Sequence, residues 1–490
     1  MKRIITLIMI ISACMATMAQ DEMEFGTGLV IDNEAYERIP QKPTLLTRDF
    51  TGLPESYSLR QYCPKVGSQG SHGTCTAWSS TYAARTIAEA VKWGWTDQKV
   101  ITEEAFAPLF IYAQIKNPTD SSCRLGTRMD LALNLLKTKG APKFKNFGVK
   151  CAEYIPKWIA DEAVEYPIDD YFTLFNHHCT SFDEKVSKIK KALSQDRPVL
   201  INMRFPSSFF RSGEVWEGNP DSKSALYHAM CVVAYDDHKE GGAFQIMNSW
   251  GETWGKDGYT WVKYADFVKC VDWAFEIYVK KARYPEVVVE EKAVEPVKPV
   301  NDVEIIQFVR EDSIKTLSGR MYIQLSTGEQ MAQRLTEGKW PVYRSKGKYM
   351  SGTRYRVYLS NDAPAYVYVI GSDLENNVSK VFPPAENISP ALVYSSNNIA
   401  LPNEEWYIEM DDTRGKDYLC VLYAEHDLPI NEICDLIKQT PGTFEDKLTS
   451  ALSGYGLVPI NDVKYNNKDI AFKATTKGSV VPLVVEITHN

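Results

Sequence analysis

Cys75 has the sequence surroundings best suited to chemistry. Glycines crowd the run from Gln69 to Cys75, and apolar residues recur at helical spacing after it, from Trp78 to Val91. We therefore expect Cys75 to open a helix, where the partial positive charge and the unpaired amides of the N-terminus favour a thiolate over a thiol. Such a thiolate can be the nucleophile of an acyl transfer, and a buried structural cysteine is the competing interpretation.

A thiol nucleophile needs a base, and His228 is the histidine that the sequence would hold most firmly. It stands at the start of Tyr227–Tyr235, a run typical of a buried strand. A histidine satisfied within the core is the competing interpretation. His177 and His178 lie in a polar stretch where we expect them to face solvent, and His72 lies in a glycine-rich loop.

A third polar residue follows His228 by twenty positions. Asn248 ends a second strand-like run and precedes Ser249, Trp250 and Gly251. Its side-chain amide can accept the histidine N–H and so fix the tautomer of the ring. The indole of Trp250 can shield that hydrogen bond from water.

These segments resemble the papain-like cysteine peptidases. The resemblance covers about residues 50–283, and Cys63-Pro64 ahead of the first motif is similar to bacterial branches of the family. It implies that Cys75 is the nucleophile, His228 the base and Asn248 the residue that orients the histidine.

The resemblance assigns further roles. It places the Gln69 side-chain amide with the Cys75 backbone N–H in an oxyanion hole, and Trp250 and Gly126 in the substrate-binding surface. Leu125 stands where one of two glycines is expected. The family's best-known disulfide is absent because His72 replaces its cysteine, and a Cys63–Cys123 bridge is a hypothesis.

The elements that must position these residues occupy about half of the 490 residues. The expected fold class is α+β: a papain-like two-lobed catalytic domain, with a helical lobe and a β-barrel-like lobe, followed by a β-rich domain. The expected divisions are a signal peptide at 1–19, a short pre-domain segment at 20–45, the catalytic domain at 46–283, a Pro/Glu-rich linker at 284–302 and the β-rich accessory domain at 303–490.

The N-terminus predicts export. Lys2 and Arg3 precede an apolar stretch that is too short to span a bilayer, and Thr17-Met18-Ala19 is a suitable cleavage site before Gln20. Acylation of Cys14 after cleavage at a lipoprotein box is the alternative. The protein is therefore expected in the periplasm, at the cell surface or secreted.

The C-terminal region changes character. Strand-like runs dominate, with two short helical patterns near 429–438 and 443–453, and alternation of apolar and polar positions suggests an antiparallel sheet with two covered faces. Motifs at 352–358, 365–369 and 381–384 resemble a bacterial domain family of unknown function. We interpret this region as a binding or positioning module, with the cell envelope or a partner protein as its ligand.

The combined prediction is hydrolysis of peptide bonds through a thioester acyl-enzyme, without cofactor or metal. The alternatives are an inactive binding protein of the same fold and an amidase- or transglutaminase-type acyl transferase. A net charge of -8 argues against nucleic acid as a partner. Because the pre-domain segment is too short for a long inhibitory pro-segment, we expect activity without a large N-terminal cleavage.

Overall fold

The computed structural model describes residues 25–43, 53–279 and 315–490, apart from short gaps at 149–150, 153, 222–225, 337, 339, 374–376, 394–396, 404–405 and 477. The predicted signal peptide and linker lie outside the described residues. The described residues form two compact units, one up to residue 279 and one from residue 315 onward, with Lys42 and Pro43 grouped with the second. No helix among the described residues is long and apolar enough to cross a membrane.

A buried helix runs through the first unit from Cys75 to Trp93. It begins as α3 (Cys75–Ala77), passes through a π-helical stretch (Trp78–Arg85) and ends as α4 (Thr86–Trp93). Gly94 stops it with a left-handed φ of 66°, which a residue without Cβ adopts at little cost. Every residue from Cys75 to Ala90 is buried, so the helix is covered on all sides.

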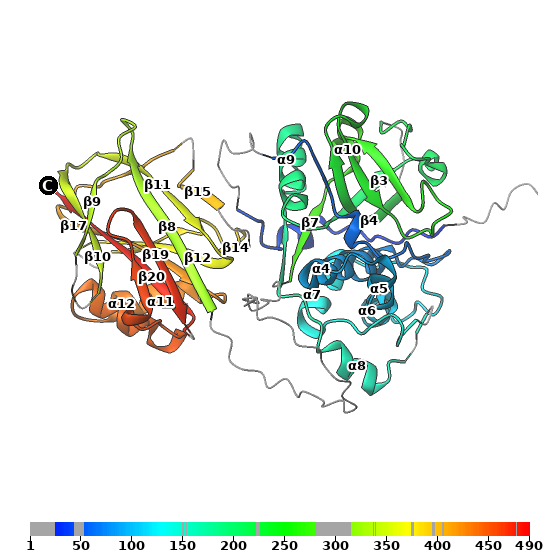
Figure 1. Ribbon diagram of the computed structural model, residues 1–490, viewed down its shortest axis with the longest axis horizontal. Coiled ribbons are helices and arrows are strands. Elements are labelled where there is room, and N and C mark those ends of the chain that lie inside the picture. The colour runs from blue at the N-terminus through cyan, green and yellow to red at the C-terminus, as the bar shows by residue number, and fades with distance from the viewer. Residues whose placement is uncertain are drawn as a thin grey trace, which may run out of the picture. The chain divides into compact units, whose positions relative to one another are not determined.

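Shorter helices accompany the buried helix (Figure 1). Their bounds are α2 Asn33–Glu37, α5 Gln98–Glu103, α6 Pro108–Ile115, α7 Met129–Lys139, α8 Lys157–Ala163, α9 Phe182–Leu193 and α10 Tyr264–Cys270. Helices α9 and α10 pack against strands of the sheet, whereas α6 and α7 pack against the buried helix. The unit therefore has a helical part and a β part, as the sequence predicted.

The sheet of the first unit is antiparallel and has the order β2-β7-β3-β4-β5-β6, with β1 on β4. The strands are β1 Ser56–Ser58, β2 Asp170–Thr173, β3 Val199–Phe205, β4 Leu226–Asp236, β5 Ala243–Met247, β6 Tyr259–Lys263 and β7 Ala274–Tyr278. Because β4 and β5 are antiparallel neighbours, the start of β4 lies beside the end of β5. This arrangement brings His228, at the start of β4, and Asn248, directly after β5, to one edge of the sheet.

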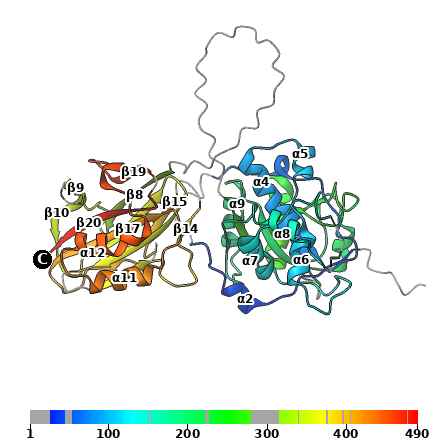
Figure 2. The ribbon, with the colours of Figure 1, turned by 90° about the horizontal axis from the view of Figure 1, so that it is seen from below.

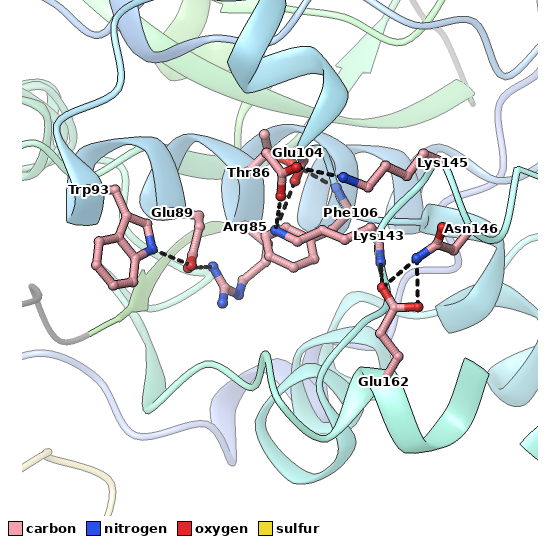
Figure 3. A network of polar contacts seen from close by, with 10 residues as sticks. All are labelled: Arg85, Thr86, Glu89, Trp93, Glu104, Phe106, Lys143, Lys145, Asn146 and Glu162. Atoms are coloured by element: carbon pink, nitrogen blue, oxygen red, sulfur yellow. Dashed lines mark hydrogen bonds and ion pairs between the residues drawn. The ribbon is translucent and has the colours of Figure 1, made fainter. Parts of the chain in front are cut away.

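Charged side chains on and beside the buried helix are paired (Figure 3). Arg85 donates to Glu89 at 2.6 Å, and both side chains are at most 4% exposed. Trp93 donates its indole N–H to the same carboxylate at 2.7 Å. Lys143 pairs with Glu104 at 3.3 Å and lies 4.0 Å from the centre of a phenylalanine ring, at Phe106. Each of these charges has an opposite charge within reach, which buried ions require.

One disulfide lies within the described residues, between Cys123 and Cys151. The hypothesis of a Cys63–Cys123 bridge is therefore wrong. Cys63 is instead a free, buried thiol that donates to the Leu59 carbonyl at 3.4 Å. Spacing along the chain could not identify Cys151 as the partner, because pairing depends on which Cβ atoms the fold brings together.

The second unit contains two sheets. The seven-stranded sheet has the order β13-β12-β17-β20-β10-β9 with β14 on β12, and the six-stranded sheet has the order β15-β11-β8-β19-β18 with β16 on β11. The strands are β8 Lys315–Leu325, β9 Gln333–Thr336, β10 Val342–Tyr349, β11 Arg354–Asn361, β12 Ala365–Ser372, β13 Val378–Phe382, β14 Ala391–Leu392, β15 Asn397–Leu401, β16 Ile408–Glu409, β17 Gly415–Ala424, β18 Val463–Tyr465, β19 Ile470–Thr476 and β20 Val480–His489. All pairs are antiparallel except β10 with β20.

Helices cover one face of the larger sheet and the second sheet covers the other (Figure 2). Helices α11 (Ile430–Gln439) and α12 (Phe444–Leu452) share a core with Cys420, Leu422 and Val484. On the opposite side Tyr423 donates to the Ser360 carbonyl of the smaller sheet at 3.1 Å. Two covered faces explain why the second half of β17 and most of β20 are apolar and buried.

Candidate active site

Cys75 occupies the first position of α3, as the sequence predicted. The residue is fully buried, and α3 packs against β4. Burial raises the pKa of the Cys75 thiol, while hydrogen bonds from the backbone amides of Ala229 and Gly28 act in the opposite direction. The thiol therefore lies beside the residue that follows His228 in the chain.

His228 and Asn248 meet at the edge of the sheet. Nε2 of His228 lies 2.7 Å from Oδ1 of Asn248, an oxygen that also accepts the backbone N–H of Ser249 at 2.7 Å. An amide oxygen can only accept, so Nε2 carries the proton and Nδ1 is the free nitrogen. Nδ1 is buried and has no hydrogen-bond partner among the described residues. This tautomer leaves Nδ1 able to take a proton.

His228 is held neutral in this structure. Complete burial lowers the pKa of its imidazole to about 4, and the hydrogen bond with Asn248 opposes that shift only in part. With the Cys75 pKa raised and the His228 pKa lowered, both groups are uncharged near neutral pH. The buried site therefore favours the thiol and the neutral imidazole over the ion pair.

Trp250 lies flat against His228. The ring centroids are 4.5 Å apart with an interplanar angle of 21°, and Trp250 is 1% exposed. Phe210 and Phe25 stack on the same indole, each at 5.1 Å. This aromatic group excludes water from the histidine, which is the main cause of its lowered pKa.

Gln69 is fixed by four hydrogen bonds. Its backbone N–H donates to the Ser249 carbonyl at 2.8 Å, and its side-chain Oε1 accepts from the Ser249 hydroxyl at 2.6 Å. Its Nε2 donates to the carbonyls of His72 at 2.6 Å and Gly26 at 3.0 Å. The amide that the sequence analysis assigns to an oxyanion hole is therefore bonded to a carbonyl oxygen of the chain itself.

Residues 25–30 cover the site. The carbonyl oxygen of Gly26 accepts from Gln69 and also from the indole N–H of Trp250 at 2.9 Å. The Gly26 N–H donates to the Gly70 carbonyl at 2.9 Å. Two residues further on, the Gly28 amide reaches the Cys75 thiol. The pre-domain segment, which was expected to be too short for an inhibitory pro-segment, thus contacts Gln69, Trp250 and Cys75.

The segment continues alongside Gly126 and Thr127. Thr127 donates its N–H to the Gly28 carbonyl at 2.9 Å and accepts from the Val30 N–H at 3.0 Å, in a parallel bridge. Gly126 lies so close that a Cβ there would be 2.2 Å from the Gly28 oxygen. The predicted substrate-binding glycine therefore faces the segment.

Two glycines that were not among the predicted site residues permit this close approach. A Cβ at Gly26 would lie 2.0 Å from the His72 carbonyl oxygen, and a Cβ at Gly28 would lie 2.1 Å from that of Gly73. No side chain other than hydrogen fits such distances. The spacing Gly26-Thr27-Gly28 in an otherwise polar segment was the available signal for a backbone that approaches another backbone.

The other histidines differ from expectation in part. Nδ1 of His72 lies 3.1 Å from the Gln69 carbonyl oxygen in the loop before Cys75, as a loop position predicts. His178 is exposed, whereas only 14% of the His177 side chain is exposed. The expectation of a solvated His177 is wrong because the N-terminal segment, through Glu37, covers it.

Comparison with known proteins relates the first unit to one protein family. The model of the papain family of cysteine proteases matches residues 53–272. Cysteine protease XCP2 of Arabidopsis thaliana is 26% identical over 220 residues, covering 44% of this chain and 56% of the relative. Cathepsin K of Mus musculus is 25% identical over 226 residues, covering 44% of this chain and 62% of the relative.

A solved structure is also similar. Xylellain, a cysteine protease from Xylella fastidiosa, has 19% identity and a TM-score of 0.42, covering 52% of this chain and 96% of its own. The chain spans less than two thirds of the length of each of the two sequence relatives named above. Over residues 53–272 the chain is therefore similar to the papain family of cysteine proteases.

Proposed function

We propose that the protein is a cysteine peptidase that hydrolyses peptide bonds in a peptide or protein substrate. One observation carries the proposal: the 2.7 Å contact between His228 and Asn248 leaves Nδ1 of His228 unprotonated and free, on the strand whose next residue, Ala229, bonds to the Cys75 thiol. That is the tautomer a general base requires. The family match of residues 53–272 supports the same reaction class.

The chemistry follows from these groups. Nδ1 of His228 takes the proton of the Cys75 thiol, and the thiolate adds to the substrate carbonyl carbon. Nε2 of Gln69 donates to the oxyanion, in the place that the Gly26 carbonyl now occupies. His228 then gives its proton to the leaving amine as the C–N bond breaks, which leaves a thioester on Cys75. A water molecule, deprotonated by His228, releases the carboxylic acid and restores the thiol.

We further propose that the full chain is latent. A substrate carbonyl must take the hydrogen bond that the Gly26 carbonyl receives from Gln69, so residues 25–30 and a substrate compete for one place. This proposal replaces the expectation of activity without N-terminal processing. The short segment is sufficient because its backbone bonds directly to the site.

Peptide turnover tests the function. Gly28→Ala, which the close contact with Gly73 should displace from the site, is expected to hydrolyse fluorogenic peptides under reducing conditions. Cys75→Ala in that background should abolish turnover, whereas loss of another free thiol, Cys179→Ala, should leave it unchanged. A folded Gly28→Ala protein that cleaves no peptide between pH 5 and 8 would contradict the proposal and favour the inactive binding protein.

Product analysis separates hydrolysis from the alternative acyl transfers. With a peptide substrate and an added primary amine, mass spectrometry should find the free carboxylic acid as the main product. A product dominated by the new amide would instead identify a transglutaminase-type acyl transferase.

Export through residues 1–19, acylation at Cys14 and binding of the envelope or of a partner protein by the second unit remain proposals from the sequence. Expression in a bacterial host, followed by fractionation into secreted and membrane-bound protein, tests the first two proposals together. Cys14→Ser is the comparison. An N-terminal residue of Gln20 on the exported chain would support simple cleavage, and a lipid mass on Cys14 would support the lipoprotein.

A further inference from the structure

Three potential metal ligands meet on the first unit away from Cys75. They are Glu37, His177 and His178, whose ligand atoms all lie within 4.8 Å of one another. Glu37 is the last residue of α2, whereas the two histidines lie in the loop between β2 and α9. From the sequence, no metal was expected and both histidines were expected to face solvent because they lie in a polar stretch. Glu37 is 140 residues away from His177 in the chain.

Buried contacts hold the two segments in this position. The hydroxyl of Tyr36, next to Glu37, donates to the Phe175 carbonyl at 2.5 Å, two residues before His177. The Tyr36 ring stacks on Trp273 at 5.1 Å, and Thr173 donates its N–H to the Pro40 carbonyl at 3.2 Å. The three ligands are therefore arranged by the fold and not by their own attraction.

The geometry of the histidines is unusual for an ordinary ion pair. Nδ1 of His177 lies 2.8 Å from Oε1 of Glu37, yet this buried nitrogen has no hydrogen-bond partner among the described residues. The rings of His177 and His178 lie only 3.6 Å apart, at 39°. An ion pair between His177 and Glu37 uses two of the three groups, whereas the fold also places His178 beside them, so that one cation could be held by all three ligands.

We propose that Glu37, His177 and His178 bind a divalent cation of the zinc type. Two imidazoles and one carboxylate suit zinc and related borderline metals, and water can complete the coordination. Magnesium and calcium prefer oxygen ligands, whereas two of the three ligands here are imidazole nitrogens.

The cation would fasten the covering segment, residues 25–30, to the rest of the domain. Helix α2 follows residues 25–30 directly, and its N-cap Asp32 already pairs with Arg128 at 2.7 Å. Metal binding at Glu37 then stabilises the covered state, because displacement of the segment would remove one ligand. This consequence rests on the proposed latency, whereas the metal site itself does not.

Zinc binding to the full chain tests the site. Cys75→Ala serves as the parent, so that the candidate nucleophile cannot bind the metal, and calorimetry with zinc chloride is run under a phosphine reductant. We expect one equivalent of zinc, with affinity reduced by on the order of tenfold or more in Glu37→Gln, His177→Ala and His178→Ala. His238→Ala is the matched control, because His238 also pairs with a glutamate, Glu55 at 3.0 Å, but belongs to no three-ligand cluster among the described residues.

Absence of stoichiometric binding would overturn the proposal. Equal binding by the parent and all three ligand variants would also overturn it, since the metal would then sit elsewhere, for example on free cysteines. The exposed His178 provides a variant that is safe for folding.

Hydrogen exchange tests the fastening. Zinc should slow amide exchange in residues 25–37 of the parent at least several-fold and have no effect on His178→Ala. Zinc that binds at the three ligands but leaves this exchange unchanged would overturn the fastening. Because the parent lacks Cys75, neither outcome depends on whether the protein is a peptidase.

Discussion

At the scale of single residues, the proposed reaction depends on Asn248 to hold the tautomer of His228. Its Oδ1 accepts a hydrogen bond from the Nε2–H of His228, and both residues are buried. Asn248→Ala leaves that N–H without a partner, which costs about 1–3 kcal/mol. We expect kcat/KM in the Gly28→Ala background to fall by on the order of 10–100-fold, as measured by peptide turnover. Unchanged turnover with an unchanged melting temperature would remove Asn248 from the proposed triad.

Acid should loosen the covered site. Burial lowers the pKa of His228 from its ordinary 6.5 to about 4. Between these values the unfolded or uncovered form binds the additional proton, so stability of the covered state is present above pH 6.5 and declines as the pH falls toward 4. Hydrogen exchange in residues 25–30 should therefore accelerate over that interval.

His228→Gln provides the comparison for the pH experiment. With the ionisable ring removed, the pH dependence between 6.5 and 4 should become weaker. Acceleration of the same size in this variant would show that His228 does not cause the effect.

At the scale of elements, residues 25–30 are held by backbone contacts that glycine alone permits. Gly26→Ala and Gly28→Ala each force a Cβ to within about 2 Å of a carbonyl oxygen, at 2.0 Å and 2.1 Å. We expect both variants to raise peptide turnover of the full chain about tenfold or more. A tenfold rise corresponds to a loss of about 1.4 kcal/mol in the free energy with which the segment binds the site. Gly213→Ala, which has open space at its Cβ, should leave turnover at the parent's level. Equal activity of all four proteins would mean that the segment does not block the site.

The buried helix makes a separate prediction about stability. Glu89→Gln leaves Arg85 charged and almost completely buried without its carboxylate (Figure 3). We expect a loss of about 3–5 kcal/mol in the unfolding free energy of the first unit, measured by urea unfolding. Asp161→Asn breaks a pair of the same spacing whose side chains are 85% and 60% exposed, and should cost less than about 1 kcal/mol. Similar losses in the two variants would show that burial does not determine how much the Arg85–Glu89 pair contributes to the unfolding free energy.

Local patterns predicted the elements but not all of their partners. Glycines before Cys75 and apolar spacing after it indicated the buried helix, and the strand that begins near His228 followed from its apolar run. The π-helical stretch at Trp78–Arg85 had no local signal. The Cys123–Cys151 bridge and the covering segment depend on contacts between distant parts of the chain, which composition and periodicity do not encode.

At the scale of the whole molecule, the two units show different degrees of predictability. The α+β class and the papain-like domain followed from three separate motifs, and the family match of residues 53–272 supports them. In the second unit, the helical patterns near 429–438 and 443–453 became α11 and α12. The covered faces were also predicted, but the division into two sheets and the parallel β10–β20 pair were not, because strand order is not contained in alternation along single strands.

The central claim is that Cys75 is an activated nucleophile which residues 25–30 keep covered in the full chain. The most direct measurement is the rate of covalent labelling by an electrophilic peptide epoxide, followed by intact mass under reducing conditions. We predict a single adduct that forms at least about tenfold faster on Gly28→Ala than on the parent and is absent when Cys75→Ala is added. Equal labelling rates for the parent and Gly28→Ala would contradict the covered site, and an adduct that persists without Cys75 would contradict the nucleophile itself.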